Sequence, residues 1–232
     1  MKIPWKFLLL STILGFVFII FPQIDLSFDR LFFGDGRFFF KNDLFIKLIF
    51  RAVPIISIAY SVFILLGLLF ICFTGRDKLF YFSKKDFIYL IFAFAIGPGL
   101  VVNVCLKDHF GRARPSQIVQ FGGDKVFTPA FVPTDQTEPN GSFVCGHSAA
   151  GFSLVALALL LEGRKRRWVI ALALFSGSVI GLVRIAQGGH FLSDVIFSFV
   201  FVYLISYALY AAMYRRSGAP SDASEQLPLE VA

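Results

Sequence analysis

Residues 52–73 read AVPIISIAYSVFILLGLLFICF, a run that contains no charged side chain. A helix of about 20 apolar residues is long enough to cross the hydrocarbon core of a bilayer. Comparable runs recur outward from it in both directions, at residues 7–21, 87–106, 143–161, 168–187 and 191–212. The sequence therefore predicts an all-α integral membrane protein built as a six-helix bundle.

The composition also favours a protein embedded in lipid. Of the 232 residues, 57% are hydrophobic and 16% are charged, with a mean hydropathy of +0.75, whereas soluble domains carry about 25% charged residues. The net charge of +7 comes from short basic clusters between the apolar runs, which argues against nucleic-acid binding. We expect one six-span domain over residues 1–216 and a short polar tail over residues 217–232.

The charge of the loops predicts how the bundle is oriented. Loops 74–86 and 162–167 and the start of the tail are dense in Lys and Arg, and the positive-inside rule places such loops in the cytoplasm. Both termini are then cytoplasmic, and the long segments 23–51 and 116–142 become periplasmic loops. The opposite face also carries Lys and Arg, so this prediction rests on the charge density of the short loops.

The two long segments differ in character. Segment 23–51 mixes Phe with Arg and Lys, as expected of a stretch in the headgroup interface or of an ordinary loop packed on the bundle. Segment 116–142 is rich in Gly, Pro and polar residues, which is typical of a connecting loop long enough to cover a site. The apolar run 7–21 lacks a small-residue cleavage pattern and is interpreted as an uncleaved anchor.

Ionisable and polar residues gather at one face of the six-span arrangement. Such residues at a membrane edge are costly to place and are usually functional. All three histidines of the chain fall in the segments concerned. In chain order, the candidates are Lys107, His109, Arg112, Arg114, Cys145, Gly146, His147, Arg184, His190 and Asp194.

Three of these residues suit a phosphate dianion, whose charge must be neutralised in a transition state. Arg114 and Arg184 offer bidentate forks, and Lys107 supplies a point charge. Backbone N–H groups near Cys145 and Gly146, at the start of a helix, add dipoles directed at an anion. The pattern predicts phosphoryl transfer.

The histidines supply the groups that would react. His190 and Asp194 are four residues apart and share a helix face, so the carboxylate can hold one imidazole nitrogen while the other attacks phosphorus. His147 is then available as the general acid for the leaving oxygen. Since three cations already balance the phosphate, we expect neither a metal nor a cofactor, and the three cysteines lack metal-ligand spacing.

The motifs resemble those of the type 2 phosphatidic acid phosphatase superfamily. KDHFGRARP at residues 107–115 matches its K-x6-R-P element, VCGH at 144–147 resembles P-S-G-H, and VRIAQGGHFLSD at 183–194 resembles S-R-x5-H-x3-D. The resemblance implies a phosphohistidine on His190, oriented by Asp194, with His147 as the acid. It also implies phosphate binding by the residues that match its cationic positions and its helix start: Lys107, Arg114, Arg184, Cys145 and Gly146.

The chain departs from these motifs at three positions. Cys145 stands where the family usually has Ser, and a thiol is a weaker donor than a hydroxyl. Val144 replaces Pro and Val183 replaces Ser. Arg112 and His109 are extra candidates in the first motif, with no role assigned to them.

Within the superfamily, FGRARP at residues 110–115 and the later FGG and NGSF stretches are most similar to bacterial lipid A phosphatases, in particular the 4'-phosphatase group. The resemblance implies a lipid phosphatase of the bacterial inner membrane, acting on a phosphate monoester of a lipid A-like headgroup from the periplasmic side. Alternative substrates are undecaprenyl pyrophosphate and phosphatidylglycerol phosphate. An anionic-lipid transporter or flippase without chemistry is the alternative from another class. The sequence predicts no oligomeric state.

Overall fold

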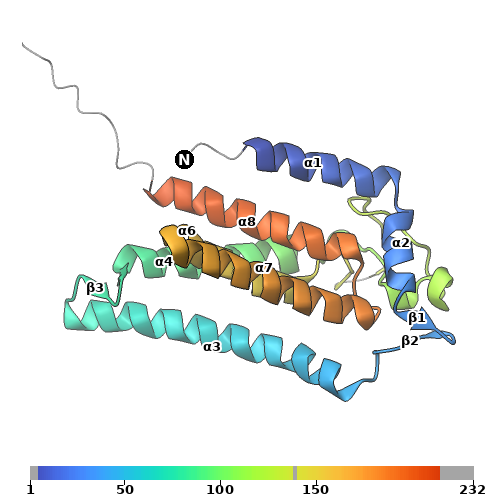
Figure 1. The fold of residues 1–232 in the computed structure, drawn as a ribbon, viewed down its shortest axis with the longest axis horizontal. Coiled ribbons are helices and arrows are strands. Elements are labelled where there is room, and N and C mark those ends of the chain that lie inside the picture. Colours follow the sequence, from blue (N-terminus) through green and yellow to red (C-terminus); the bar gives the residue numbers. More distant parts are fainter. Residues whose placement is uncertain (1–4, 138–139, 215–232) are drawn as a thin grey trace, which may run out of the picture.

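The computed structural model describes residues 5–137 and 140–214, and most of these are helical. Figure 1 shows long helices running side by side. The α-helices are α1 (Trp5–Ile20), α2 (Gln23–Arg30), α3 (Leu44–Thr74), α4 (Lys84–Phe94), α5 (Gly146–Phe152), α6 (Leu154–Leu159), α7 (Gly163–Ala186) and α8 (Leu192–Tyr214).

Shorter elements complete the described chain. Helix α4 continues without a break into a π-helix, η1 (Ala95–Leu106), which contains Pro98, and two single 3-10 turns follow, η2 (Pro115–Gln117) and η3 (Val119–Phe121). Two antiparallel hairpins pair β1 (Phe33–Gly34) with β2 (Arg37–Phe38) and β3 (Lys78–Leu79) with β4 (Phe82–Ser83).

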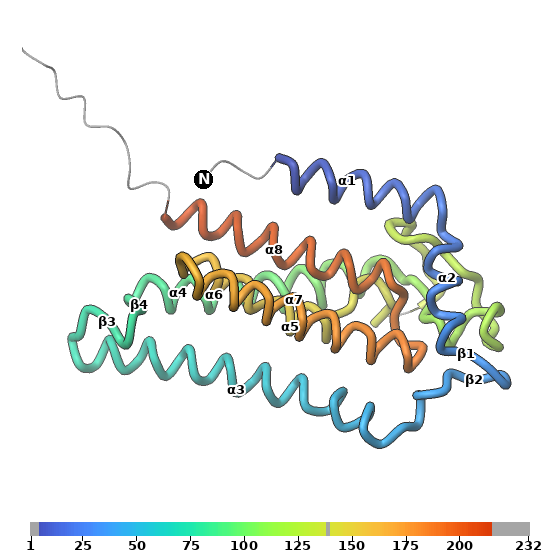
Figure 2. The backbone as a smooth tube through the Cα atoms, viewed as in Figure 1, coloured from blue at the N-terminus to red at the C-terminus, as the bar shows by residue number. Residues whose placement is uncertain are grey.

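The two ends of the bundle are different. At one end, α2, the β1–β2 hairpin and the long connection between η1 and α5 fold together (Figure 2), and we call this the loop end. At the other end, the β3–β4 hairpin meets the start of α7, where the Lys165 Nζ lies 4.4 Å from the centre of the Tyr81 ring. Because the basic segments 74–86 and 162–167 meet there, we call it the basic end.

Local sequence explains where the central helices begin. The side chain of Asp43 accepts a hydrogen bond of 2.9 Å from the Ile46 N–H and so caps α3, which then runs to Thr74 and ends at Gly75 in the left-handed region. Ser83 and Asp86 form a reciprocal capping box at the start of α4. Side-chain caps satisfy backbone N–H groups that a helix start leaves unpaired.

Four helical segments of the described chain are long and apolar enough to cross a membrane: α3, α4 with η1, α7 and α8. The count becomes five if α1 and α2, which meet at an angle of 80°, form one bent span. The α5–α6 segment, Gly146–Leu159, is apolar but shorter. A helical protein with several membrane-crossing helices is therefore confirmed, whereas the count of six remains a prediction.

Several predicted boundaries were wrong. Helix α3 begins at Leu44, so the segment 23–51 is not one loop but contains α2, a hairpin and the first two turns of α3. The basic residues 164–167 lie in the first turn of α7 and not in a loop, because that helix begins at Gly163. The fourth predicted span, 143–161, is broken at Ser153 into α5 and α6. The predicted tail, 217–232, lies outside the described residues.

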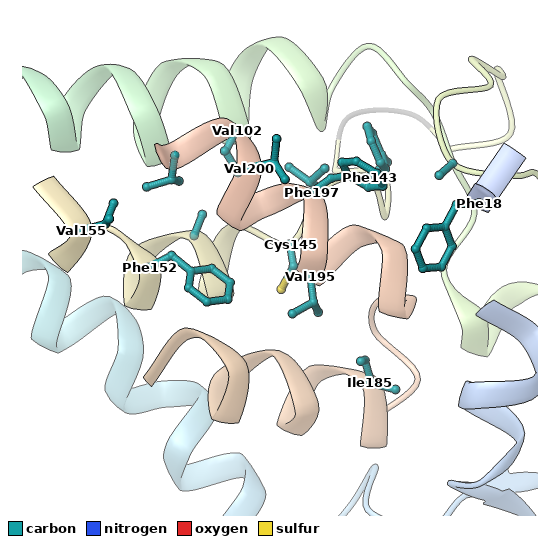
Figure 3. Packing of buried hydrophobic residues seen from close by; sticks show 14 of the residues in the cluster. Phe18, Val102, Phe143, Cys145, Phe152, Val155, Ile185, Val195, Phe197 and Val200 are labelled. Carbon is teal, nitrogen blue, oxygen red and sulfur yellow. The ribbon is translucent and has the colours of Figure 1, made fainter. Parts of the chain in front are cut away.

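Buried apolar side chains join the loop end to the membrane helices. The largest cluster combines residues of η1, α5, α7 and α8 with the segment that precedes α5. Figure 3 shows Cys145 within it, with Phe152, Val195 and Phe197 around it. A smaller cluster packs Phe38 and Phe121 against Phe191. The chain on both sides of α5 and α8 is thereby held against the bundle.

Candidate active site

The predicted phosphate-binding residues line two neighbouring cavities at the loop end. Arg114 and Arg184 line one, of ≈340 Å³, which we call the headgroup cavity. Lys107 and His147 line the other, of ≈250 Å³. Phe50 of α3 connects them, because its ring stacks on His147 at 4.5 Å and lies 4.6 Å from the Arg184 guanidinium. The three motif segments therefore meet here, and they are joined by Phe50, which lies outside the motifs and more than a hundred residues before Arg184.

Arg114 is held by the segment that precedes α5. Its Nη2 donates to the backbone oxygen and the side-chain Oδ1 of Asn140, at 3.1 and 2.9 Å. The Asn140 N–H in turn donates to Asp108 Oδ1 at 3.0 Å, and the Gly141 N–H donates to the Lys107 carbonyl at 3.1 Å. The cations of the first motif are thus fixed by the chain that leads into the second.

Arg184 retains donor capacity for a ligand. Its Nη1 donates to Gln187 Oε1, while its Nε is buried and has no hydrogen-bond partner among the described residues. Gly189 makes room for the guanidinium, since a Cβ at that position would lie 2.5 Å from Arg184 Nη2. A buried donor without a partner costs free energy, and an anion bound in this cavity offsets that cost.

Crowded positive charge marks the site as an anion site. Burial lowers the pKa of Lys107, and the charge of Arg114 acts in the same direction. Burial also lowers the pKa of Arg114. The shift of Lys107 therefore reflects burial together with facing cations, which is a condition that a bound phosphate relieves.

His190 is buried and oriented by two acceptors. Its Nδ1 lies 2.7 Å from the Ser142 carbonyl and 3.5 Å from Asp194 Oδ2. Because a carbonyl oxygen only accepts, Nδ1 carries the proton and Nε2 keeps its lone pair. His190 Nδ1 therefore donates to the Ser142 carbonyl and not, as predicted, to Asp194. The Asp194 carboxylate still lies close enough to stabilise positive charge on the ring.

The protonation state of His190 suits a nucleophile. Burial lowers its pKa to about 3, although Asp194 opposes the shift, and the charges of Arg184 and Arg114 reinforce it. The imidazole is consequently neutral at physiological pH, and its free nitrogen can attack an electrophile.

Asp194 belongs to a buried network that the sequence did not reveal. Its Oδ1 accepts from Arg112 Nη1 at 2.6 Å, and its Oδ2 accepts from Ser142 Oγ and from the Phe191 N–H. Arg112 is 1% exposed and also donates to Asp25 Oδ2 at 2.8 Å. Burial disfavours the charge on Arg112, but the two carboxylates outweigh it and raise its pKa.

His147 can hold or accept a proton in the site. Its Nε2 is buried and has no hydrogen-bond partner among the described residues, and its ring is held by stacking on Phe50. Burial lowers the pKa of His147 to about 4, and the charges of Arg184, Lys107 and Arg114 act in the same direction, so the ring by itself is neutral at physiological pH. A phosphate dianion beside the ring offsets these charges and raises its pKa, which is the condition under which His147 can donate a proton.

The start of α5 is less open than the sequence predicted. The Cys145 N–H donates to the Asp194 backbone carbonyl at 3.1 Å, so this donor is already used. The Cys145 thiol is buried among apolar side chains, and burial raises its pKa to about 11, which keeps it protonated. Gly146 packs against Asn103, whose Oδ1 would lie 2.3 Å from an added Cβ, so a larger residue here would have to displace the Asn103 side chain.

Three residues of the site were missed by sequence reasoning. Asp25 and Phe50 lie in the segment that we had interpreted as a loop, and Ser142 contributes a backbone carbonyl, which no residue type encodes. Among these, only Asp25 carried a signal, as an acidic residue in an apolar surrounding. His109 is exposed, with Nδ1 3.2 Å from the Val104 carbonyl, and it lines neither cavity.

A bundle of apolar helices that holds a cationic cavity and two histidines at one end defines the class of integral-membrane phosphatases. The chain belongs to the PAP2 superfamily, whose family model matches residues 88–217. It is accordingly a lipid phosphatase, a hydrolase of phosphoric monoesters.

Curated relatives agree with this assignment. The chain is 40% identical to the lipid A 4'-phosphatase of Francisella tularensis subsp. novicida, over 86% of this chain and 90% of the relative. It is 31% identical to the lipid A 4'-phosphatase of Rhizobium leguminosarum, over 85% and 88%. The chain is also 34% identical to a lipid A 1-phosphatase of Rhizobium etli, over 55% of this chain and 50% of the relative. No solved structure matches the chain.

The buried position of Arg112 generates a prediction about stability. Arg112→Met leaves the carboxylates of Asp194 and Asp25 buried without their counter-ion, so we expect a loss of about 3–5 kcal/mol in the free energy of unfolding. Thermal and denaturant unfolding in detergent measure it. Arg30→Met, at the exposed end of α2, is the matched control and should stay within about 0.5 kcal/mol of the original protein. Equal effects of both substitutions would contradict a structural role for the Arg112 network.

A substitution at Gly189 is expected to lower phosphatase activity without lowering the stability of the protein. In Gly189→Ala the new methyl group displaces the Arg184 guanidinium, which is the end of a flexible side chain, so stability should hold. Phosphatase activity should fall by about 10²- to 10³-fold, the effect of losing one transition-state donor. Gly97→Ala is the control, since its nearest neighbour, Ile205, lies 4.0 Å away. Undiminished activity in Gly189→Ala would show that this position of Arg184 is not needed.

Proposed function

We propose that the protein removes a phosphate monoester from a lipid A-like headgroup on the periplasmic side of the bacterial inner membrane, without a metal, through a phosphohistidine on His190. The observation that carries the proposal is that Arg114, Arg184, Lys107 and His147 line two cavities that are linked by contacts of Phe50. The names of the relatives support the substrate class.

The first step forms a bond between His190 Nε2 and phosphorus and breaks the bond from phosphorus to the lipid oxygen. His147 gives a proton to the departing alkoxide. The charge that develops on the equatorial oxygens is met by the forks of Arg114 and Arg184 and by Lys107. Asp194, 3.5 Å from His190 Nδ1, stabilises the positive charge that the ring gains when it is phosphorylated.

The second step hydrolyses the phosphohistidine. His147, now neutral, takes a proton from a water molecule that attacks phosphorus, and the bond to His190 Nε2 breaks. Inorganic phosphate leaves and His190 returns as a neutral imidazole. The Ser142 carbonyl and the Arg112 network keep the ring in one orientation through both steps.

The apolar part of the substrate has a route to this site. The cavity lined by Lys107 and His147 is also lined by Val53, Pro54 and Phe94, from α3 and α4. It lies between membrane-crossing helices, so acyl chains can remain in the bilayer while the phosphate enters the cationic region.

Replacing each histidine tests the mechanism. His190→Ala should abolish phosphate release from every substrate, because the covalent step is lost. His147→Ala should lose about 10²- to 10⁴-fold on a lipid alkoxide, but far less in phosphoenzyme formation from p-nitrophenyl phosphate, whose leaving group needs no proton. The measurement is phosphate release, and trapped phosphoenzyme, from purified protein in excess chelator.

The lipids tested are lipid A, undecaprenyl pyrophosphate and phosphatidylglycerol phosphate. Release of no phosphate from any of them would favour a transporter or flippase. Recovery only on adding Mg²⁺ would contradict the metal-free mechanism. Equal losses on both kinds of leaving group in His147→Ala would refute its role as the acid.

The orientation of the bundle is a second part of the proposal. The residues of the phosphate site include the start of α3 and the end of α7, and Figure 1 shows these helix ends at the loop end, away from the β3–β4 hairpin of the basic end. Dense basic segments favour the cytoplasm. The termini are then cytoplasmic and the site faces the periplasm. The start of α1 and the end of α8 lie toward the basic end in Figure 1, which supports an even number of crossings.

Cysteine labelling tests this orientation. Cys72 and Cys105 are exposed and are first replaced by Ser, whereas Cys145 is buried. With a membrane-impermeant maleimide and cells whose outer membrane is permeabilised, Val126→Cys at the loop end should be labelled and Asp77→Cys at the basic end should not. Both should be labelled in lysed membranes. The reverse pattern in cells would place the site in the cytoplasm.

A further inference from the structure

We infer that the headgroup cavity binds a second anionic group of the same lipid through Lys41, Lys47 and Arg51, so that the preferred substrate carries a second phosphate besides the one removed. The inference rests on the proposed function and adds a specificity-determining subsite to it. None of these three residues belongs to the catalytic motifs, and all lie outside the matched region 88–217.

The first observation is an excess of positive charge in the cavity. Five of its ten lining residues are basic and none is acidic. The reacting phosphate is already met by Arg114 and Arg184 together with Lys107 from the neighbouring cavity. Lys41, Lys47 and Arg51 therefore add three positive charges beyond what one phosphate monoester dianion requires.

The second observation is that these charges have no acidic partner in the described chain. Its ion pairs join Arg112 and His190 to carboxylates, and none includes Lys41, Lys47 or Arg51. Lys47 Nζ donates to Asn42 Oδ1 at 3.1 Å, a neutral acceptor that orients it. Lys47 and Arg51 are four residues apart on α3, where like charges repel. An anion between them offsets this repulsion.

The third observation is the direction in which these residues face. Lys47, Phe50 and Arg51 stand at helical spacings of three and four, so they share one face of α3. Phe50 contacts both Arg184 and His147, which fixes that face toward the site. The cavity is also lined by Gln187, Gly188 and Gly189. Lys47 is half-buried, whereas Lys41 and Arg51 are exposed, so the three cations border a cavity that is open to the outside.

The alternative is that these cations only anchor the protein to anionic headgroups of the bilayer. That role predicts an equal effect of their removal on every substrate, since it does not depend on the headgroup in the cavity. A subsite predicts an effect that grows with the number of anionic groups on the substrate.

The test compares two lipids that differ by one phosphate. The protein with Lys41→Gln, Lys47→Gln and Arg51→Gln is assayed in non-ionic micelles on lipid A with phosphates at positions 1 and 4' and on lipid A with the 4'-phosphate alone. We expect kcat/KM to fall at least about tenfold more on the bisphosphate than on the monophosphate, as for the loss of charge-assisted contacts. The control carries Lys78→Gln, Lys84→Gln and Arg164→Gln at the basic end and should not change the ratio.

A binding measurement separates this inference from the proposed function. Lipid A with the 1-phosphate alone, the product expected from the bisphosphate, is titrated into the unsubstituted and the triple-variant protein. We expect the triple variant to bind it at least about tenfold more weakly. If the protein hydrolyses neither lipid but this difference in binding is found, the proposed function fails and the subsite stands. Equal losses of kcat/KM on both lipids, or equal binding of the product, would overturn the subsite.

Discussion

The buried ion pairs of Arg112 are the interaction on which the site depends. One guanidinium, in the connection between η1 and α5, holds the carboxylates of Asp194 from α8 and Asp25 from α2. Taking such charges out of water is costly, and only mutual compensation makes it tolerable. The network therefore requires the loop end to fold in one way, with α2 beside the start of α8, and it keeps Asp194 ionised next to His190.

At the same end of the molecule, the cations that line the two cavities have no carboxylate partner in the described chain, in contrast to Arg112. In the headgroup cavity and its neighbour, Arg114, Arg184 and Lys107 form no ion pair among the described residues, and Arg184 and His147 each have a buried nitrogen without a hydrogen-bond partner there. The carboxylates of Asp25 and Asp194 are thus paired with Arg112, whereas the cations of the cavities can bind an anionic ligand. This separation places a strongly basic site in a chain whose net charge is +7.

Helix α3 connects the chemistry to the membrane. Its apolar length crosses the bilayer, and its first turns bring Phe50 into contact with His147 and Arg184. The family match begins only after this helix, at residue 88, so the catalytic motifs and the proposed second anion subsite come from different parts of the chain. The first 60 residues also supply Phe50 and Asp25, which contact the phosphate site and its supporting network.

The sequence by itself determined the helical membrane class and nominated Lys107, Arg114, His147, Arg184, His190 and Asp194, because apolar runs and residue types at fixed spacings are local signals. It did not determine where α3 and α7 begin, since both helices start before their apolar runs, α3 at a side-chain cap from Asp43 and α7 at Gly163 without such a cap. Tertiary structure alone decided that Ser142 holds His190, that Asp25 shares Arg112 with Asp194, and that Phe50 links the cavities. These contacts join segments far apart in the chain, and no local periodicity carries information about which distant groups meet.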